Sequence, residues 1–153
     1  MRNFRIIMMS VAMLMASTSL MAQHVTTTLR GAGTVGMWGF PCTLTITPDG
    51  KGVIKGEATK EVGDLTVSFK AQPNILYEII KGNGFMWSYI KDATVSPFTM
   101  KEKQQHSTIN PKGNGKFNGI TETNAKDIKC YVRFPISTPN GESVFDIYFT
   151  FTK

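Results

Sequence analysis

The sequence predicts an all-β protein: a single antiparallel up-and-down barrel of about eight strands, with a β-sandwich as the alternative. Two observations support this prediction. Apolar and polar side chains alternate over many short segments, as Cys42, Leu44 and Ile46 do against the threonines between them. Pro, Asn, Asp and Gly recur between these segments at short intervals, which is typical of strands joined by tight turns. No segment shows a convincing helical period.

The first residues, 1–22, are predicted to be a secretory signal peptide. Two arginines precede an uncharged apolar run over residues 6–16, and small and polar residues follow it. The run is shorter than the roughly 20 residues that span a bilayer. We therefore expect one β domain over residues 23–153, exported to the periplasm or the exterior, with no membrane span in the mature chain.

The strands are assigned in chain order from the alternation and the turns between them. A short segment at 25–30 precedes the first clear strand, Met37–Thr47, and the glycine-rich stretch 31–36 is interpreted as a flexible lead-in. Pro97 places its strand at an edge or a bulge, and the polar stretch 103–115 is the longest loop. The remaining strands are expected at 52–59, 65–69, 75–80, 85–90, 94–102, 116–123, 128–136 and 143–152.

Two of the turns have the same composition. Residues 47–50 and 138–141 each read Thr-Pro-Asp/Asn-Gly. Proline presets φ, Asp or Asn bonds locally, and glycine accepts a positive φ. Each turn is therefore expected to join two strands as a hairpin. The last strand is the most amphipathic, with Phe145, Ile147, Phe149 and Phe151 on one face.

Two cysteines, Cys42 and Cys130, remain once the leader is set aside. Both fall on the apolar faces of expected strands, and exported proteins commonly pair an even number of cysteines. We expect a Cys42–Cys130 disulfide that closes a loop of about 90 residues. The alternative is two separate buried thiols that pack as small apolar groups.

The segment Gly36-Met37-Trp38 comes just before the first clear strand. It resembles the Gly-x-Trp signature of lipocalins and wider calycin-type barrels, and the hairpin at 44–52 resembles the first hairpin of small bacterial lipocalin-like domains. The resemblance implies that Trp38 plugs one end of a barrel beneath an arginine from a late strand, for which Arg133 is the candidate. The alternative for Trp38 is an ordinary aromatic residue of the core or rim.

Three aromatic residues, Phe85, Trp87 and Tyr89, would share one face of a strand after the turn Gly82-Asn83-Gly84. Three interpretations stay open: core packing, the lining of a barrel cavity, or an outward platform for sugar or protein contact. An eight-stranded barrel can hold one small ligand. Trp38, Phe85, Trp87 and Tyr89 are therefore the candidate ligand contacts.

Residues typical of catalysis or metal binding form no recognisable motif. The histidines, His24 and His106, stand alone without metal-ligand spacing. The glycines of 31–36 match a dinucleotide fingerprint, but no βαβ unit follows. We expect no metal, no cofactor and no enzymatic activity.

Removal of the leader with Arg2 and Arg5 lowers the formal net charge from +6 to +4, and the lysines that remain are scattered rather than gathered in a dense basic block. Lysines near strand ends and turns are typical of a solvated surface with protected strand edges, so no nucleic acid partner is expected. The sequence predicts an exported binding protein, lipocalin-like, that holds a small apolar ligand or contacts a partner protein. The alternative is a β-sandwich that acts as a surface, adhesion or protein-interaction module with no internal ligand.

Overall fold

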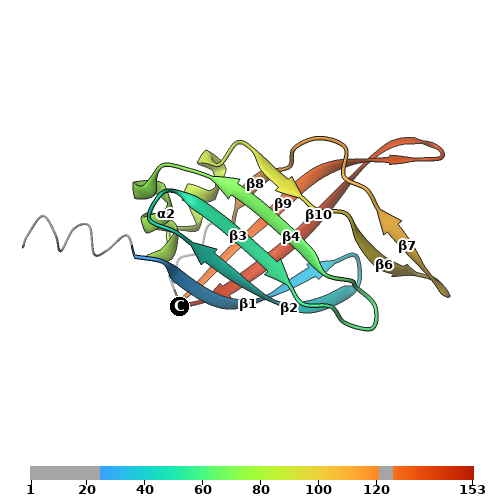
Figure 1. The fold of residues 1–153 in the computed structure, drawn as a ribbon, viewed down its shortest axis with the longest axis horizontal. Helices are drawn as coiled ribbons and strands as arrows, with labels where there is room; N and C mark the ends of the chain where they lie inside the picture. The colour runs from blue at the N-terminus through green and yellow to red at the C-terminus, as the bar shows by residue number, and fades with distance from the viewer. Residues whose placement is uncertain (1–24, 121–125) are drawn as a thin grey trace, which may run out of the picture.

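The chain winds up and down around a nearly closed barrel in which the first and last strands are neighbours (Figure 1). The computed structural model describes residues 25–120 and 126–153, so the expected signal peptide at 1–22 and His24 lie outside the described residues. Eight strands form one antiparallel sheet in the order β5-β4-β3-β2-β1-β10-β9-β8. These strands are β1 Thr27–Val35, β2 Trp38–Ile46, β3 Lys51–Gly56, β4 Leu65–Lys70, β5 Ala93–Val95, β8 Lys116–Gly119, β9 Asp127–Thr138 and β10 Gly141–Thr152. The predicted all-β, up-and-down barrel is confirmed.

Both predicted Thr-Pro-Asp/Asn-Gly turns join antiparallel neighbours, β2 to β3 and β9 to β10. Each ends on a glycine with positive φ: 92° at Gly50 and 116° at Gly141. These values lie where a side chain would be strained, which explains why glycine occupies both positions. The two predicted hairpins are therefore confirmed.

The barrel closes at a seam between β5 and β8. Ala93 and Gly115 exchange two backbone hydrogen bonds across it, with N···O distances of 3.0 and 2.6 Å. Beside this bridge, the 3₁₀ helix η1 (Gly84–Tyr89) lies against β8. A Cβ atom on Gly119 would lie 1.6 Å from the carbonyl oxygen of Gly84, so only glycine lets η1 approach β8 this closely. The helix therefore takes the place of a full strand pairing along the seam.

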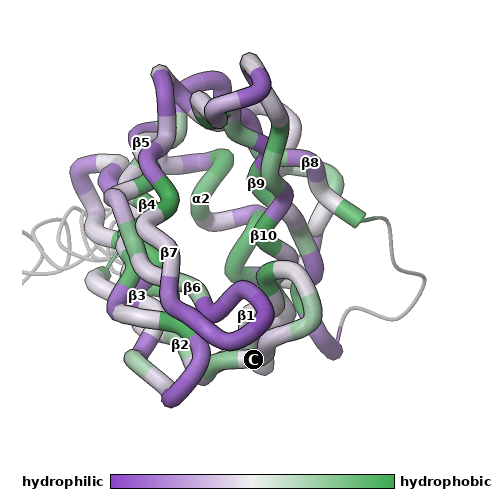
Figure 2. The backbone as a smooth tube through the Cα atoms, turned by 90° about the vertical axis from the view of Figure 1, so that its right-hand side faces the viewer, coloured by the Kyte–Doolittle hydropathy of each residue, from purple (hydrophilic) through white to green (hydrophobic). Residues whose placement is uncertain are grey.

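The two ends of the barrel are covered differently. The helix α2 (Pro73–Ile80) lies at one end, and a separate hairpin of β6 (Phe98–Glu102) and β7 (Gln105–Ile109) lies at the other (Figure 1). Figure 2 views the molecule from the β6–β7 end, with the strands arranged in a ring and α2 on the far side. Leu76 and Ile79 anchor α2 because both side chains are buried in the core. In the described part of the chain, no helix is long and apolar enough to cross a bilayer.

Phenylalanine rings inside the barrel cover glycines on the neighbouring strands. In three cross-strand pairs a glycine stands opposite a phenylalanine, and a Cβ atom on the glycine would meet the ring: Gly33 with Phe40, Gly52 with Phe69 and Gly31 with Phe151. The ring fills the space that the glycine leaves, as in the aromatic rescue of strand glycines. The stretch 31–36, predicted to be a flexible lead-in, therefore runs as strand β1 through Val35.

Two segments predicted as strands are helical. Residues 75–80 fall in α2, whose proline occupies the first turn, where the missing N–H costs no hydrogen bond. Residues 85–89 fall in η1. The prediction was wrong for both because short apolar runs do not by themselves distinguish a strand from a buried helical turn.

Two other predictions need smaller corrections. The strand expected at 94–102 is divided into β5 and β6 at Ser96-Pro97, because proline cannot donate to a ladder. The loop expected at 103–115 contains β7. The strand expected at 116–123 is β8 as far as Gly119, and its residues 121–123 lie outside the described part.

Candidate functional site

A groove of about 940 Å³ opens on the outer face of β3, β4 and β5, beside the start of α2. Its size falls within the roughly 300–1,000 Å³ typical of small-molecule sites. The residues that give the groove its chemistry are Lys51, Ser68, Lys70, Tyr89, Lys91 and Thr94. We call this hollow the β3–β5 groove.

Strand register places these side chains together on the outside of the barrel. Gly52 and Phe69 form an inward pair, so their neighbours Lys51 and Lys70 form the next, outward pair. In the pairing of β4 with β5, Ser68 stands opposite Thr94. Two lysines and two hydroxyl-bearing side chains therefore line neighbouring positions on one sheet surface.

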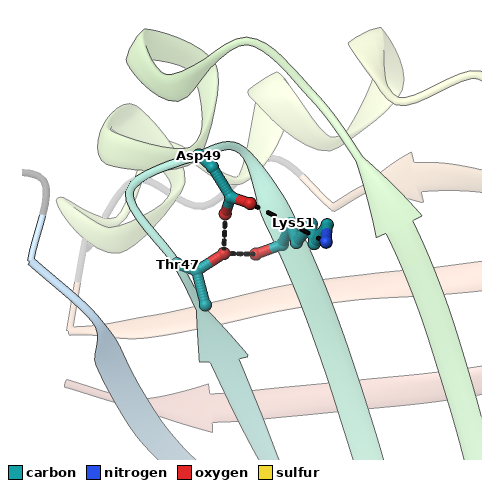
Figure 3. A network of polar contacts seen from close by, with 3 residues as sticks. All are labelled: Thr47, Asp49 and Lys51. Atoms are coloured by element: carbon teal, nitrogen blue, oxygen red, sulfur yellow. Dashed lines mark hydrogen bonds and ion pairs between the residues drawn. The ribbon is translucent and has the colours of Figure 1, made fainter.

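The turn between β2 and β3 forms a rim of the groove, and Figure 3 shows the polar contacts of Thr47, Asp49 and Lys51 in this turn. The Thr47 hydroxyl donates to the carboxylate of Asp49 and lies 3.3 Å from the carbonyl oxygen of Lys51. The hydrogen bond from Thr47, together with the Lys51 ammonium 3.8 Å away, lowers the pKa of Asp49. The Gly50 carbonyl also accepts a 2.9 Å hydrogen bond from Ala71, which ties the turn to the segment before α2. The rim is therefore held by its own contacts before any ligand arrives.

The groove has more uncompensated positive than negative charge. Of its two carboxylates, Asp49 is engaged as described, and Asp92 accepts from the side-chain amide of Asn114 at 3.5 Å. Lys70 and Lys91 form no ion pair with any residue in 25–120 or 126–153. These two ammonium groups therefore remain available to an incoming anion.

Of the predicted contact residues, the structure brings Tyr89 to the groove, where its side chain is 53% exposed. Phe85 is also exposed, and its ring centroid lies 6.3 Å from that of Tyr89. Trp87 points the other way and is fully buried. The single face expected for Phe85, Trp87 and Tyr89 is therefore wrong: a 3₁₀ helix has three residues per turn, so residues two apart point in different directions.

Aromatic rings occupy the barrel interior around Trp87. Its ring centroid lies 4.7 Å from that of Phe117, 5.7 Å from Phe69 and 6.3 Å from Phe151. The indole Nε1 is buried and has no hydrogen-bond partner among the described residues, which is a cost to folding. The rings therefore pack against one another in the interior beside Trp87.

Trp38 and Arg133 have different contact partners. Trp38 is partly buried, and its indole Nε1 donates to the carbonyl oxygen of Lys101 at 2.8 Å, so it links β2 to the β6–β7 hairpin. Arg133 is on the outer face of β9, where its guanidinium makes two hydrogen bonds to Asp146, at 2.9 and 3.0 Å. The pairing of Trp38 with Arg133 is therefore corrected: Arg133 points away from the interior that Trp38 borders.

The two cysteines are free thiols in the structure, both buried. The expected disulfide is not formed, since the thiols are free although their strands, β2 and β9, belong to one barrel. The two cysteines are near enough for Cys42 to add to the rise in the pKa of Cys130. Burial raises the pKa of Cys42 to about 12 and also raises that of Cys130. The alternative of two separate buried thiols is what the structure has.

The lysines and hydroxyls of the β3–β5 groove were not predicted from the sequence. Lys51 and Lys70 were interpreted only as solvated residues near strand ends. The sequence signal was the pairing of β3 with β4. The turn at 47–50 and the alternation over 65–69 set a register in which Lys51 stands opposite Lys70. In the described residues, no group of three or more His, Cys, Asp or Glu side chains is arranged to hold a metal ion.

No protein-family model, curated protein or solved structure matches the chain. The barrel itself, all-β with eight antiparallel strands, is compatible with a calycin-like fold.

Proposed function

We propose that this chain is an exported, non-enzymatic binding protein of the lipocalin-like type that takes its ligand in the β3–β5 groove rather than inside the barrel. The observation that carries the proposal is the contrast between the two places. The groove offers about 940 Å³ of open space, while contacting aromatic rings fill the interior around Trp87. A polar ligand fits this site better than the small apolar ligand expected from the sequence.

The lining supports binding rather than catalysis. The groove presents ammonium, hydroxyl and phenol groups at fixed positions on a rigid sheet, together with a tied rim. Fixed polar groups that converge on a hollow give a ligand its orientation. The proposal assigns the barrel the role of a scaffold, and the groove the role of the recognition surface.

The test blocks the groove from its floor. Ser68 is exposed on the outward face of β4, so Ser68→Trp places a large side chain in the groove at a strand position that tolerates aromatic residues. Thr34→Trp is the matched control, because Thr34 is exposed on the outward face of β1, away from the groove. Both variants and the parent chain are incubated with a low-molecular-weight extract of the natural source and measured by native mass spectrometry.

We expect the parent chain and Thr34→Trp to retain the same added mass, and Ser68→Trp to lose it. An added mass that persists in Ser68→Trp would move the ligand away from the groove. No added mass on the parent chain would contradict the proposal that it binds a small molecule.

A further inference from the structure

We infer that the ligand of the β3–β5 groove is an anionic saccharide, a sugar chain that carries carboxylate or sulfate groups. The inference rests on the proposed function, since it names the ligand class of that same groove. Its basis is the juxtaposition of three lysines, several hydroxyl-bonding side chains and one exposed aromatic ring in a single hollow.

The three lysines come from three separate segments. Lys51 begins β3, Lys70 ends β4, and Lys91 precedes β5. Lys51 has only a loose partner, 3.8 Å away across an exposed pair, and Lys70 and Lys91 have no ion-pair partner in the described part of the chain. The groove also holds the carboxylates of Asp49 and Asp92, so its three lysines leave an excess of one positive charge, and ammonium groups in excess of carboxylates attract an anion.

The pairing of Lys51 with Lys70 is unfavourable for the fold by itself. The two residues stand directly opposite each other in the β3–β4 ladder, and like charges at such positions destabilise a sheet. An anion between the two ammonium groups would turn this repulsion into attraction. The arrangement is therefore explained if the groove is occupied.

The rest of the lining favours a sugar over other anions. Ser68 and Thr94 offer hydroxyls, and Asp92 accepts hydrogen bonds, so the groove can both donate to and accept from the hydroxyl groups of a saccharide. The Tyr89 ring is 53% exposed and gives an apolar surface for the C–H face of a sugar ring. An anionic membrane would also attract lysines and exposed aromatic residues, but the groove is a hollow rather than a protruding face, so a membrane is the alternative outcome of the test.

The probes are two matched pairs of oligosaccharides, titrated by isothermal calorimetry into the full chain. Oligogalacturonate is compared with its methyl ester, which keeps the sugars and removes the carboxylate charges. A chondroitin sulfate oligosaccharide is compared with its desulfated form. We expect at least one charged probe to bind about tenfold or more tightly than its partner, with an affinity that falls as salt is added.

The variants test where the charge acts. We expect the triple change Lys51→Gln, Lys70→Gln, Lys91→Gln to weaken the charged probe about tenfold or more. The triple change Lys55→Gln, Lys60→Gln, Lys103→Gln removes the same total charge from exposed positions outside the groove and leaves the affinity in place. Tyr89→Ala weakens binding, while Tyr148→Ala, an exposed tyrosine on β10, does not. Circular dichroism confirms that each variant is folded.

Each other outcome has a definite meaning. Equal binding of charged and neutral probes that Ser68→Trp abolishes would overturn the anionic class and leave the groove as the binding site. Equal losses in the two lysine triples would overturn the assignment of the charge to the groove. Binding to vesicles of phosphatidylserine and phosphatidylcholine without binding of any saccharide would replace the inference with a membrane contact. The protein could also bind none of these probes and still retain an added mass from the source extract that Ser68→Trp removes. That result would overturn the saccharide as the ligand class and leave the groove as the binding site.

Discussion

Cys42 and Cys130 contribute to the barrel interior as small apolar groups rather than as a covalent link. Both thiols are buried, and they remain unbonded. Desolvation is the main reason that the pKa of Cys42 rises to about 12, and the charge of Glu57 adds to the shift. At neutral pH both groups are therefore protonated and poorly reactive.

This burial predicts a loss of stability in alkali. An unfolded thiol ionises near its ordinary value of 9.0, whereas folded Cys42 stays protonated to about 12. The contribution of Cys42 is thus complete below pH 9 and is lost as pH rises toward 12, because only the unfolded state releases its proton in that window. At pH 10.5 the loss is about 2 kcal/mol relative to pH 8.

Urea denaturation at both pH values, with parent chain and Cys42→Ala side by side, measures this effect. The parent chain is expected to lose more free energy of unfolding than the variant between pH 8 and 10.5. Equal losses would mean that Cys42 is not protected by burial. In the same material, iodoacetamide is expected to label both cysteines only after unfolding and without a reductant, since neither thiol is bonded.

Single residues also show how much of the candidate site could be predicted from the sequence. Tyr89 was a candidate contact and does line the groove, whereas Trp87, only two residues earlier, is buried. The difference comes from the local helix. Side chains two residues apart point to the same face of a strand, but in a 3₁₀ helix they point in different directions. The lysines were not predicted as site residues because the sequence does not show directly which residue stands opposite a lysine on the neighbouring strand.

Among the elements, the strands that alternate between a buried and an exposed face were predictable, and the helices were not. β4 and β10 follow the expected pattern because one face of each meets the core. In α2 the apolar residues Ile75, Leu76, Ile79 and Ile80 have helical spacing, but over a run short enough to be read as a strand. For η1, the decisive fact is a long-range approach to β8 that no local pattern contains.

The approach of η1 to β8 gives a prediction about glycine. Gly119→Ala would place a methyl group against the Gly84 carbonyl, so we expect η1 to be displaced at a cost of about 1–3 kcal/mol, the range for overpacked sites. Gly39→Ala is the matched control in a strand, where the nearest atom would be 3.7 Å away. The free energy of unfolding measures the difference, and tryptophan fluorescence, recorded in a Trp38→Phe background so that it reports on the buried Trp87, follows the displacement of η1. Two variants of equal stability would contradict the close packing of η1.

At the scale of the whole molecule, barrel closure is uneven. β9 and β10 pair along their whole length of 12 residues each. In the described chain, β5 is joined to the β8 side by a single bridge between Ala93 and Gly115, the residue before β8. The up-and-down barrel of about eight strands was predictable from turns and alternation, although two of the expected strands are helical. The place of the seam was not, because it depends on how η1 and the β6–β7 hairpin interrupt the succession of strands.

The seam is expected to open before the rest of the barrel. Local opening requires less free energy where few backbone hydrogen bonds must break. Amide hydrogen exchange followed by NMR should therefore give lower protection for Ala93 and Gly115 than for Val132 and Ile147 at the centre of β9 and β10. Uniform protection around the barrel would show that η1 secures the seam as firmly as a strand.

The contact between β1 and β10 has a consequence for the biogenesis of the protein. Arg30 and Gly31 find their partners in Thr152 and Phe151, more than a hundred residues downstream. During synthesis, one edge of β1 can pair with β2 early. Its other edge has no partner until β10 has been made. Such distant contacts slow folding, so the pairing of β1 with β10, which joins the two ends of the described chain, is expected to be a late step in the assembly of the barrel.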